Sequence, residues 1–399
     1  MIFIHNKKEC TGCYACFNIC SRDCITMEPD SEGFYYPEVD YSKCVKCGSC
    51  IMVCPTKNRT TVRQWNIKAY ACINKNSSIR QKSSSGGIFS LLAENVISKG
   101  GVVFGAVFTD NFVIQHSYIE NKEEIGKMRG SKYVQSSIGH TFKQAKEFLD
   151  RGRYVFFSGT PCQISGLKKY LGQNYNNLLC QDLICHGVPS PMVWRKYLTW
   201  KEQKAGAKAT KVSFRSKTKG WRNYSLYLQY ENGTQYSKTI NDDLYLVGFN
   251  NNLYLRPSCY ACPFKTAFRE ADITLADFWG IQSIEPAFND DKGVSLVLIH
   301  SVKGENIFDE LKDKMECKQV NFNEAIRYNP AMLKSMTINS NREKFFSEIA
   351  SYDFGKLMNK YCKEKLVIRL KKKIRNAAKA ILIYFNLFDE FKKVYRRGN

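Results

Sequence analysis

The sequence predicts an α/β body with a mixed β-sheet, preceded by a small cysteine-rich module and followed by a basic helical tail. Three observations support this prediction. Eight cysteines fall within the first 54 residues, strand-like and helix-like segments alternate from about residue 70, and Lys and Arg dominate residues 363–399. Alternating strands and helices are typical of a sheet that helices cover. The 399 residues are enough for two or three domains.

The composition describes a globular protein of a reducing compartment. Hydrophobic residues make up 44% of the chain and aromatic residues 13%, as in folded proteins. The N-terminus is too short to form a secretory signal, and no apolar run reaches the roughly 18 residues of a membrane span. The 17 cysteines are an odd number, and their tight spacing fits metal thiolates better than disulfides. We therefore expect a cytoplasmic protein.

The first module carries the runs "CTGCYACFNIC" and "CVKCGSCIMVC", both with the spacing C-x2-C-x2-C-x3-C. This spacing is typical of two-cluster ferredoxins, in which the fourth cysteine of each run binds the cluster of the other run. A structural zinc site, the alternative, usually pairs two C-x2-C units. We predict two [4Fe–4S] clusters, the first on Cys10, Cys13, Cys16 and Cys54, the second on Cys44, Cys47, Cys50 and Cys20. Pro55 follows the last ligand as expected, Ser21 replaces the corresponding proline of the first run, and Cys24 has no place in either cluster.

The body begins after a polar segment and alternates strands with helices. A hairpin with Asn232 and Gly233 at its turn covers residues 224–240. We expect strands at residues 100–108, 112–119, 154–159, 177–187, 271–277 and 294–301. We expect helices over residues 139–152 and 162–172, and two more that begin near Ile88 and at Pro191.

Two polar loops are candidates for phosphate binding. Ser84, Ser85, Gly86 and Gly87 precede the helix that begins near Ile88, and free N–H groups at a helix start attract anions. A plain loop with an N-cap is the alternative.

The second loop, "MRGSKYVQSS", contains Lys132 and Tyr133. These side chains can hold a phosphate or stack on a ring, although a solvated turn explains the residue types equally well.

Four further cysteines form a candidate third cluster site. Cys162 and Cys185 follow predicted buried strands, whose ends meet at one edge of a parallel sheet, and Cys259 and Cys262 form a C-x2-C pair. Four thiolates are enough for a cubane. A free buried thiol at Cys162 is the alternative, and Cys180 is a competing ligand within its strand. Cys72, Cys317 and Cys362 are expected to pack as small buried residues.

The segments "SSSGGIFS", "RGSKYVQS", "GTPCQISGLKKYL", "DLICHGVPSP" and "CYACPFK…ADITLADFWGI" resemble landmarks of the coenzyme F420 hydrogenase/dehydrogenase beta-subunit family. The resemblance covers roughly residues 1–330 in the same order. It implies a flavoprotein that holds FAD beside an iron–sulfur cluster. Family substrates include the deazaflavin F420 and chlorophyll intermediates, and related copies occur among surface-polysaccharide genes.

The resemblance also implies roles for particular residues. The resemblance assigns flavin contacts to Ser84, Ser85, Gly86, Gly87, Lys132, Tyr133 and the loop after Gly159. Asp277 and Trp279 would line the active site, or else cap a turn and fill the core. His186 would donate protons or bond a cluster sulfur, with a structural role as the alternative.

Three functions are compatible with these sequence features. The first is an oxidoreductase that passes electrons from the clusters to FAD and on to a small or lipid-linked substrate, with ferredoxin or a reductase subunit as donor. The second is a non-catalytic electron-transfer subunit of a larger complex. The third, nucleic-acid binding, rests on the net charge of +23 alone and on no recognised motif.

The domains predicted from these patterns are residues 1–58, 68–150, 151–330 and 331–399. The last of these domains contains a basic segment, residues 363–399. This segment has 12 Lys and Arg and 3 Asp and Glu, so its net charge is +9. A helix of this composition can lie on an anionic membrane surface. Docking on the body is the alternative.

Overall fold

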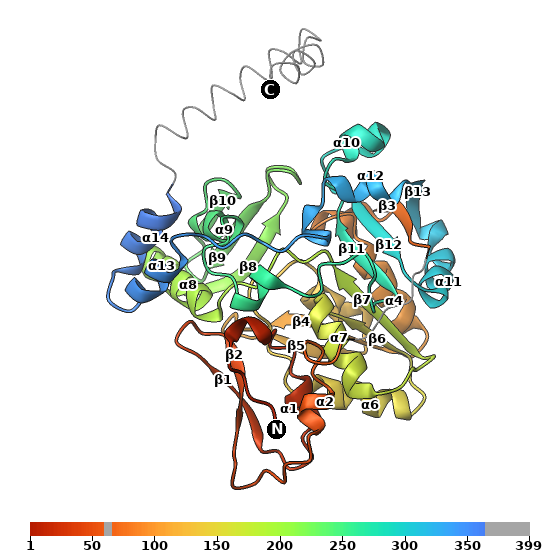
Figure 1. Ribbon diagram of the computed structural model, residues 1–399. Helices are drawn as coiled ribbons and strands as arrows, with labels where there is room; N and C mark the ends of the chain where they lie inside the picture. The colour runs from red at the N-terminus through yellow and green to blue at the C-terminus, as the bar shows by residue number, and fades with distance from the viewer. Residues whose placement is uncertain (60–65, 364–399) are drawn as a thin grey trace, which may run out of the picture.

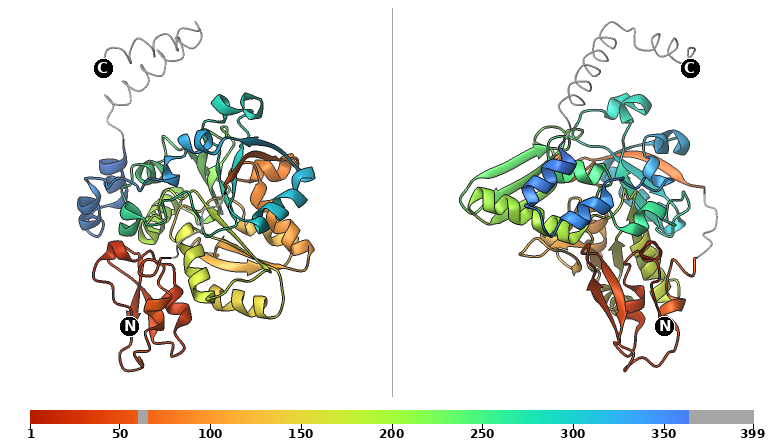
Figure 2. Two further views of the ribbon diagram at one scale, coloured as in Figure 1. Left: turned by 45° about the vertical axis from the view of Figure 1, so that its right-hand side comes forward. Right: turned by 60° about the vertical axis from the view of Figure 1, so that its left-hand side comes forward.

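An eight-stranded mixed sheet forms the centre of the computed structural model, which describes residues 1–59 and 66–363 (Figures 1 and 2). The strand order is β13-β3-β12-β11-β7-β6-β4-β5. Strands β4, β6, β7 and β11 are parallel to their neighbours within this group, and the other pairings are antiparallel. The strands are β3 (Lys68–Asn74), β4 (Val102–Phe108), β5 (Ile114–Ile119), β6 (Val155–Ser158), β7 (Leu178–Leu183), β11 (Ile273–Asp277), β12 (Ser295–Ile299) and β13 (Met315–Val320).

Helices cover both faces of this sheet because its strands are apolar on both sides. Phe156 of β6 packs with α4 (Ile88–Ser98) and α11 (Val302–Glu310) on one face. Its neighbour Phe157 packs with α6 (Thr141–Asp150) and α7 (Pro161–Leu171) on the other face. Successive side chains of a strand point to opposite faces, so the run predicted as buried serves two cores.

A second, three-stranded antiparallel sheet lies beside the first and consists of β8 (Ala209–Ser216), β9 (Ser225–Tyr230) and β10 (Gln235–Thr239) (Figure 1). The predicted hairpin is therefore confirmed, but it belongs to a sheet of its own. Its core is shared with α8 (Pro191–Ala205), α9 (Leu244–Asn250), α13 (Arg342–Glu348) and α14 (Phe354–Cys362). Leu357 and Met358 of α14 are buried there, so residues 331–363 pack on the body. The basic residues 364–399 lie outside the described part.

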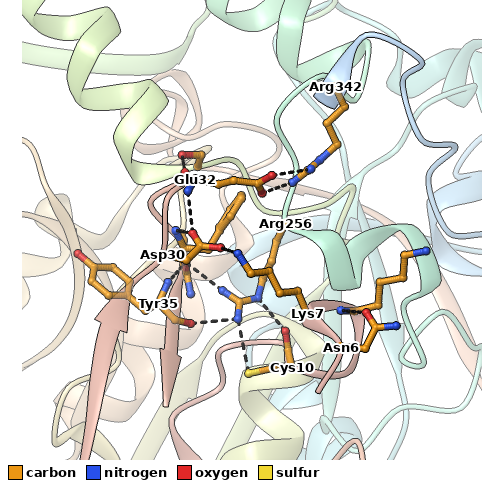
Figure 3. A network of polar contacts seen from close by, with 12 residues as sticks. Asn6, Lys7, Cys10, Asp30, Glu32, Tyr35, Arg256 and Arg342 are labelled. Carbon is orange, nitrogen blue, oxygen red and sulfur yellow. Dashed lines mark hydrogen bonds and ion pairs between the residues drawn. The ribbon is translucent and has the colours of Figure 1, made fainter. Parts of the chain in front are cut away.

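The N-terminal module packs against the base of the body (Figure 1). It contains α1 (Ala15–Ile19), β1 (Ile25–Pro29), β2 (Tyr35–Val39) and α2 (Ser49–Met52). The turn between β1 and β2 reaches the body, where Glu32 forms a bidentate ion pair with Arg342 of α13 (Figure 3). At Gly33 the backbone has a φ of +82° and a Cβ atom would lie 2.5 Å from Cβ of Met192, so this contact needs glycine.

Shorter elements complete the chain. They are η1 (Lys7–Glu9), α3 (Ser77–Lys82), η2 (Lys122–Glu124), α5 (Ile125–Met128), η3 (Pro257–Ala261), α10 (Ile281–Ile284), η4 (Pro286–Phe288), η5 (Lys312–Lys314), α12 (Phe322–Arg327) and η6 (Pro330–Met332). No helix within residues 1–59 and 66–363 is long and apolar enough to cross a membrane.

Candidate functional site

A cavity of about 680 Å³ opens at the carboxyl ends of the parallel strands. Its wall includes Gly105 of β4, Ser158 of β6, Leu183 of β7 and Asp277 of β11. Loops that leave adjacent parallel strands diverge at this edge, so ligands of open α/β sheets bind there. The predicted site residues on the cavity wall are Ser84, Ser85, Gly87, Lys132, Tyr133, Gly159, Cys162, Cys185, His186, Asp277 and Trp279.

Two of the four cysteines proposed for a third cluster, Cys162 and Cys185, line this cavity. Cys162 lies in the first turn of α7, Cys185 follows β7, and Cys259 and Cys262 lie in and after η3. Burial, together with the neighbouring Cys262 and Cys185, raises the pKa of the Cys162 thiol to about 12. Burial and the same neighbours also raise the pKa of Cys259. The thiols thus act on one another electrostatically although they come from three distant segments.

Local structure holds Cys162 in place at the start of α7. Pro161 occupies the first turn of the helix, where its missing N–H is not needed. The backbone N–H of Thr160 donates to Oε1 of Gln163 at 2.8 Å, and Thr160 Oγ1 lies 3.1 Å from Cys162 Sγ. The competing ligand Cys180 is fully buried within β7. Burial raises its pKa, and the neighbouring charges that shift it are those of Lys168, Asp272, Lys303 and Glu270 rather than the other thiols.

The two cysteine runs of the N-terminal module have the same backbone shape. Gly12 and Tyr14 adopt positive φ values of 67° and 66°, and the equivalent positions of the second run, Lys46 and Gly48, adopt 56° and 81°. Left-handed residues at matched positions curl both loops, so the sequence repeat is also a structural repeat.

The thiols of Cys13 and Cys16 in the first run are enclosed, whereas the second run reaches the surface at one cysteine. Burial raises the pKa of Cys16, and Cys13, Cys10 and Cys54 raise it further. In the second run Cys47 is exposed. The remaining members are also placed by contacts: Cys50 Sγ accepts from the Ile2 N–H at 3.1 Å, and Cys20 Sγ lies 3.3 Å from Sγ of Cys24, which is itself beside Cys44.

Among the described residues, no three His, Cys, Asp or Glu side chains are arranged to hold a single metal ion. The ligand assignments for all three clusters therefore stay predictions.

The serine–glycine loop forms one wall of the cavity. Ser84 Oγ accepts from the Ser131 N–H at 2.7 Å, which ties this loop to the loop of Lys132. Gly87 is the N-cap of α4 and provides no side-chain cap, so N–H groups at the helix start remain available to a ligand. Gly86 lies behind the wall, where a Cβ atom would be 2.3 Å from the Cys72 carbonyl oxygen.

Lys132 is held by backbone carbonyls rather than by an acid. Its Nζ donates to the carbonyl oxygens of Met128 and Gly130, each at 3.2 Å. Enclosure by the cavity wall lowers the pKa of Lys132 to about 7. Tyr133 stacks on Phe249 with ring centroids 4.7 Å apart, and its hydroxyl oxygen accepts from Arg215 Nη1 at 3.1 Å.

Asp277 is fully engaged by two side chains that the sequence reasoning missed. Its carboxylate oxygens accept from Nη1 and Nη2 of Arg215 at 2.7 and 2.8 Å, and Oδ1 also accepts from Trp221 Nε1 at 2.7 Å. Trp221 stacks on Trp279 at 4.9 Å. Asp277 therefore positions Arg215 and an aromatic pair at the wall. No sequence signal links Arg215 to Asp277, because they lie in different sheets.

Two histidines also face the cavity. His186 Nε2 bonds Asn252 Oδ1 at 2.7 Å, and burial lowers the His186 pKa. His116, which the sequence reasoning missed, lies between Ser136 Oγ at 2.6 Å and the Ser158 carbonyl oxygen at 3.1 Å. Burial lowers the pKa of His116 to about 4.

Comparison with known proteins agrees with this architecture. Residues 69–142 and 152–325 match the N-terminal and C-terminal models of the coenzyme F420 hydrogenase/dehydrogenase beta subunit. The chain belongs to this family. Residues 9–58 match a 4Fe-4S dicluster domain, so this family member is an iron–sulfur electron-transfer protein.

Individual relatives are distant. A subunit of the F(420)H(2) dehydrogenase of Methanosarcina mazei is 21% identical over 326 residues, 77% of this chain and 83% of the relative. A subunit of the NADH-quinone oxidoreductase of Geobacter metallireducens is 39% identical over 56 residues, 13% of this chain and 43% of that protein. A chain of the F420-reducing [NiFe] hydrogenase complex from Methanosarcina barkeri gives a TM-score of 0.45 at 16% identity, covering 70% of this chain and 91% of that chain.

Proposed function

We propose that this family member is an iron–sulfur flavoprotein oxidoreductase that passes electrons from ferredoxin-type [4Fe–4S] clusters to FAD and on to a small or lipid-linked substrate. The observation that carries the proposal is one cavity in which the serine–glycine loop, Lys132 and Tyr133 face Cys162 and Cys185. The loops proposed to bind phosphate and two of the thiols proposed as cluster ligands line the same cavity.

The residues around the first cysteine run fit a cluster. A Cβ atom on Gly12 would lie 2.6 Å from Nε2 of Gln135, a buried donor without a hydrogen-bond partner in the described part of the chain. The loop without a side chain at Gly12 leaves room for a ligand, and Nε2 of Gln135 can donate a hydrogen bond to it. Both features suit an acceptor of the size and charge of a cluster sulfide. A Cβ atom on Gly166 would likewise lie 3.1 Å from Cys13 Sγ. Gly166 is one helical turn from Cys162, so the first and third cluster sites adjoin.

The cavity wall fits FAD. The N–H groups at the start of α4, after Gly87, and the ammonium group of Lys132 would hold the phosphates of FAD. The aromatic rings of Tyr133 and Trp279 could stack on the rings of FAD. When bound, FAD would exchange two electrons with a substrate and single electrons with iron–sulfur clusters. His186, on the cavity wall beside Cys185, would donate protons or bond a cluster sulfur.

Electrons would enter at the second cysteine run. Cys47 is exposed there, among the exposed apolar residues Val45 and Met52 and beside the exposed Lys46. The nearby Lys43 is paired with Asp40 at 3.2 Å. An exposed apolar surface with a cation at its edge suits a protein partner that carries an acidic group. We therefore propose a ferredoxin or a reductase subunit as the donor.

The alternative is a non-catalytic electron-transfer subunit of a larger complex. The name of its Methanosarcina mazei relative, a dehydrogenase subunit, favours this function. The two functions differ in whether the FAD-loaded chain alone oxidises or reduces a substrate.

The lipid-linked substrate and a place in surface-polysaccharide synthesis rest on the family resemblance and on the basic segment 363–399. A cationic segment of this kind is attracted to the anionic inner face of a membrane. Peripheral attachment would bring the cavity near lipid-linked substrates.

Anaerobic purification followed by iron, sulfide and flavin analysis tests the proposal. We expect about twelve iron atoms per chain, four for each of three clusters, together with one FAD. Iron near eight with full flavin content would remove the third cluster. Neither FAD nor FMN after anaerobic reconstitution, with the clusters intact, would overturn the flavoenzyme proposal.

A further inference from the structure

Arg256 is a buried cation at the junction of the N-terminal module and the body. It immediately precedes η3, the segment that carries Cys259, and is 1% exposed. Its backbone N–H donates to the Val188 carbonyl at 2.8 Å, which fixes the start of η3 beside the loop after β7. The side chain points away from η3 into the N-terminal module (Figure 3).

The guanidinium group contacts the first cysteine run. Nε donates to the Cys10 carbonyl oxygen at 2.8 Å, and Nη2 donates to the Tyr35 carbonyl oxygen at 3.0 Å (Figure 3). Nη2 also lies 3.5 Å from Cys10 Sγ. Nη1 lies 3.4 Å from Oε1 of Gln135, and the group sits 4.1 Å from the ring centroid of Tyr36.

Within residues 1–59 and 66–363, no carboxylate forms an ion pair with Arg256. The two carboxylates of the neighbouring turn are engaged elsewhere, Asp30 with Lys7 at 2.5 Å and Glu32 with Arg342 (Figure 3). A buried charge without a counter-ion is costly. The sulfur that Arg256 meets belongs to Cys10, so a thiolate-bound anionic cluster would supply the missing negative charge.

We propose that Arg256 directs electron transfer through its charge. Its guanidinium group raises the reduction potential of the cluster bound by Cys10 above that of the cluster at Cys47. This inference rests on the proposed ligand sets. A fixed positive charge beside Cys10 favours the form of the cluster that holds one more electron. The entry cluster loses that electron, the inner cluster gains it, and no proton moves. Electrons are thereby retained at the end of the module that adjoins α7 and Cys162.

The test is an anaerobic redox titration of the full chain, followed by electron paramagnetic resonance, for Arg256→Met and the parent. We expect the midpoint potential of one N-terminal cluster to fall by at least the equivalent of a tenfold change in its reduced-to-oxidised ratio, about 59 mV for one electron. The midpoint of the cluster at Cys47 should stay unchanged, and Arg256→Lys should restore most of the loss. Unchanged potentials in Arg256→Met at full iron content would overturn the proposal.

A second variant guards against a folding defect in Arg256→Met. Gln135→Glu places a carboxylate where Oε1 of Gln135 now meets Nη1 of Arg256 at 3.4 Å. It neutralises the cation without removing it and also removes the Nε2 donor beside Gly12. Both changes disfavour the reduced cluster, so the same midpoint should fall. A midpoint equal to the parent's in this variant also contradicts the proposal.

The matched control is the double variant Glu32→Gln, Arg342→Met. It removes another buried arginine of the same interface with no change of net charge, and all midpoints should remain those of the parent. A fall in the control equal to that of Arg256→Met would assign the effect to domain contact and overturn the electrostatic role. Loss of the third cluster would show as missing iron and fail the proposed function separately, because the N-terminal midpoints can still be measured.

Discussion

Replacing Asp277 with alanine should destabilise the body, because it removes the counter-ion of a buried arginine. The side chain of Arg215 is 3% exposed and that of Asp277 is 16% exposed. Loss of one partner of a buried ion pair costs about 3–5 kcal/mol, and the partial exposure of Asp277 places this pair near 3. In domains of about 150–250 residues each kcal/mol lowers Tm by about 2–4 °C. The expected fall is therefore about 6–12 °C.

Differential scanning calorimetry of anaerobically purified protein measures this fall, with the variants matched for iron and flavin content because bound cofactors also shift Tm. The control is the double variant Arg215→Met, Asp277→Ala, in which no charge is left unpaired. Replacing both members of a buried pair is far less costly than removing one, so the double variant should regain at least half of the lost Tm. A fall below about 2 °C for Asp277→Ala, or a double variant as unstable as the sum of the single variants, would refute the reasoning.

Three further predictions follow from the cysteines, Lys132 and the basic segment. Cys162→Ala should lose about four iron atoms and keep the N-terminal pair of clusters, whereas full iron content would show that Cys162 is not a ligand. In FAD-depleted protein at pH 8, Lys132 should be mostly neutral, because burial lowers its pKa to about 7. A bound phosphate group raises that pKa, so FAD binding should take up a proton that Lys132→Met does not take up. Titration calorimetry in two buffers of different ionisation enthalpy measures this uptake, and equal values in parent and variant would exclude Lys132 as its source. A chain truncated after Lys363 should lose sedimentation with anionic vesicles at low salt, and equal binding by both chains would exclude the basic segment as the anchor.

Much of the architecture could be predicted from the sequence because the signals are local. The apolar runs at β6 and β7, the proline at the start of α8 and the asparagine–glycine turn of the hairpin each specify structure within a few residues. The segments β3 and β13 were not predicted. Strand β13 lies at the edge of the sheet and is exposed at several positions. Its alternation of apolar and polar residues depends on this edge position rather than on the strand propensity of its residues.

The sequence by itself determined the two ferredoxin-type motifs, since cysteine spacing and loop shape are encoded within eleven residues. It also placed Cys162 and Cys185 at one edge of the sheet, because both follow parallel strands. Only the tertiary structure decided which charged side chains lie beside the cysteines and the cavity. Arg215 reaches Asp277 across 62 positions, and Arg256 reaches Cys10 across 246. A buried cation has no local pattern, because its partner is selected by how distant segments pack and by the cost of leaving a charge unpaired away from water.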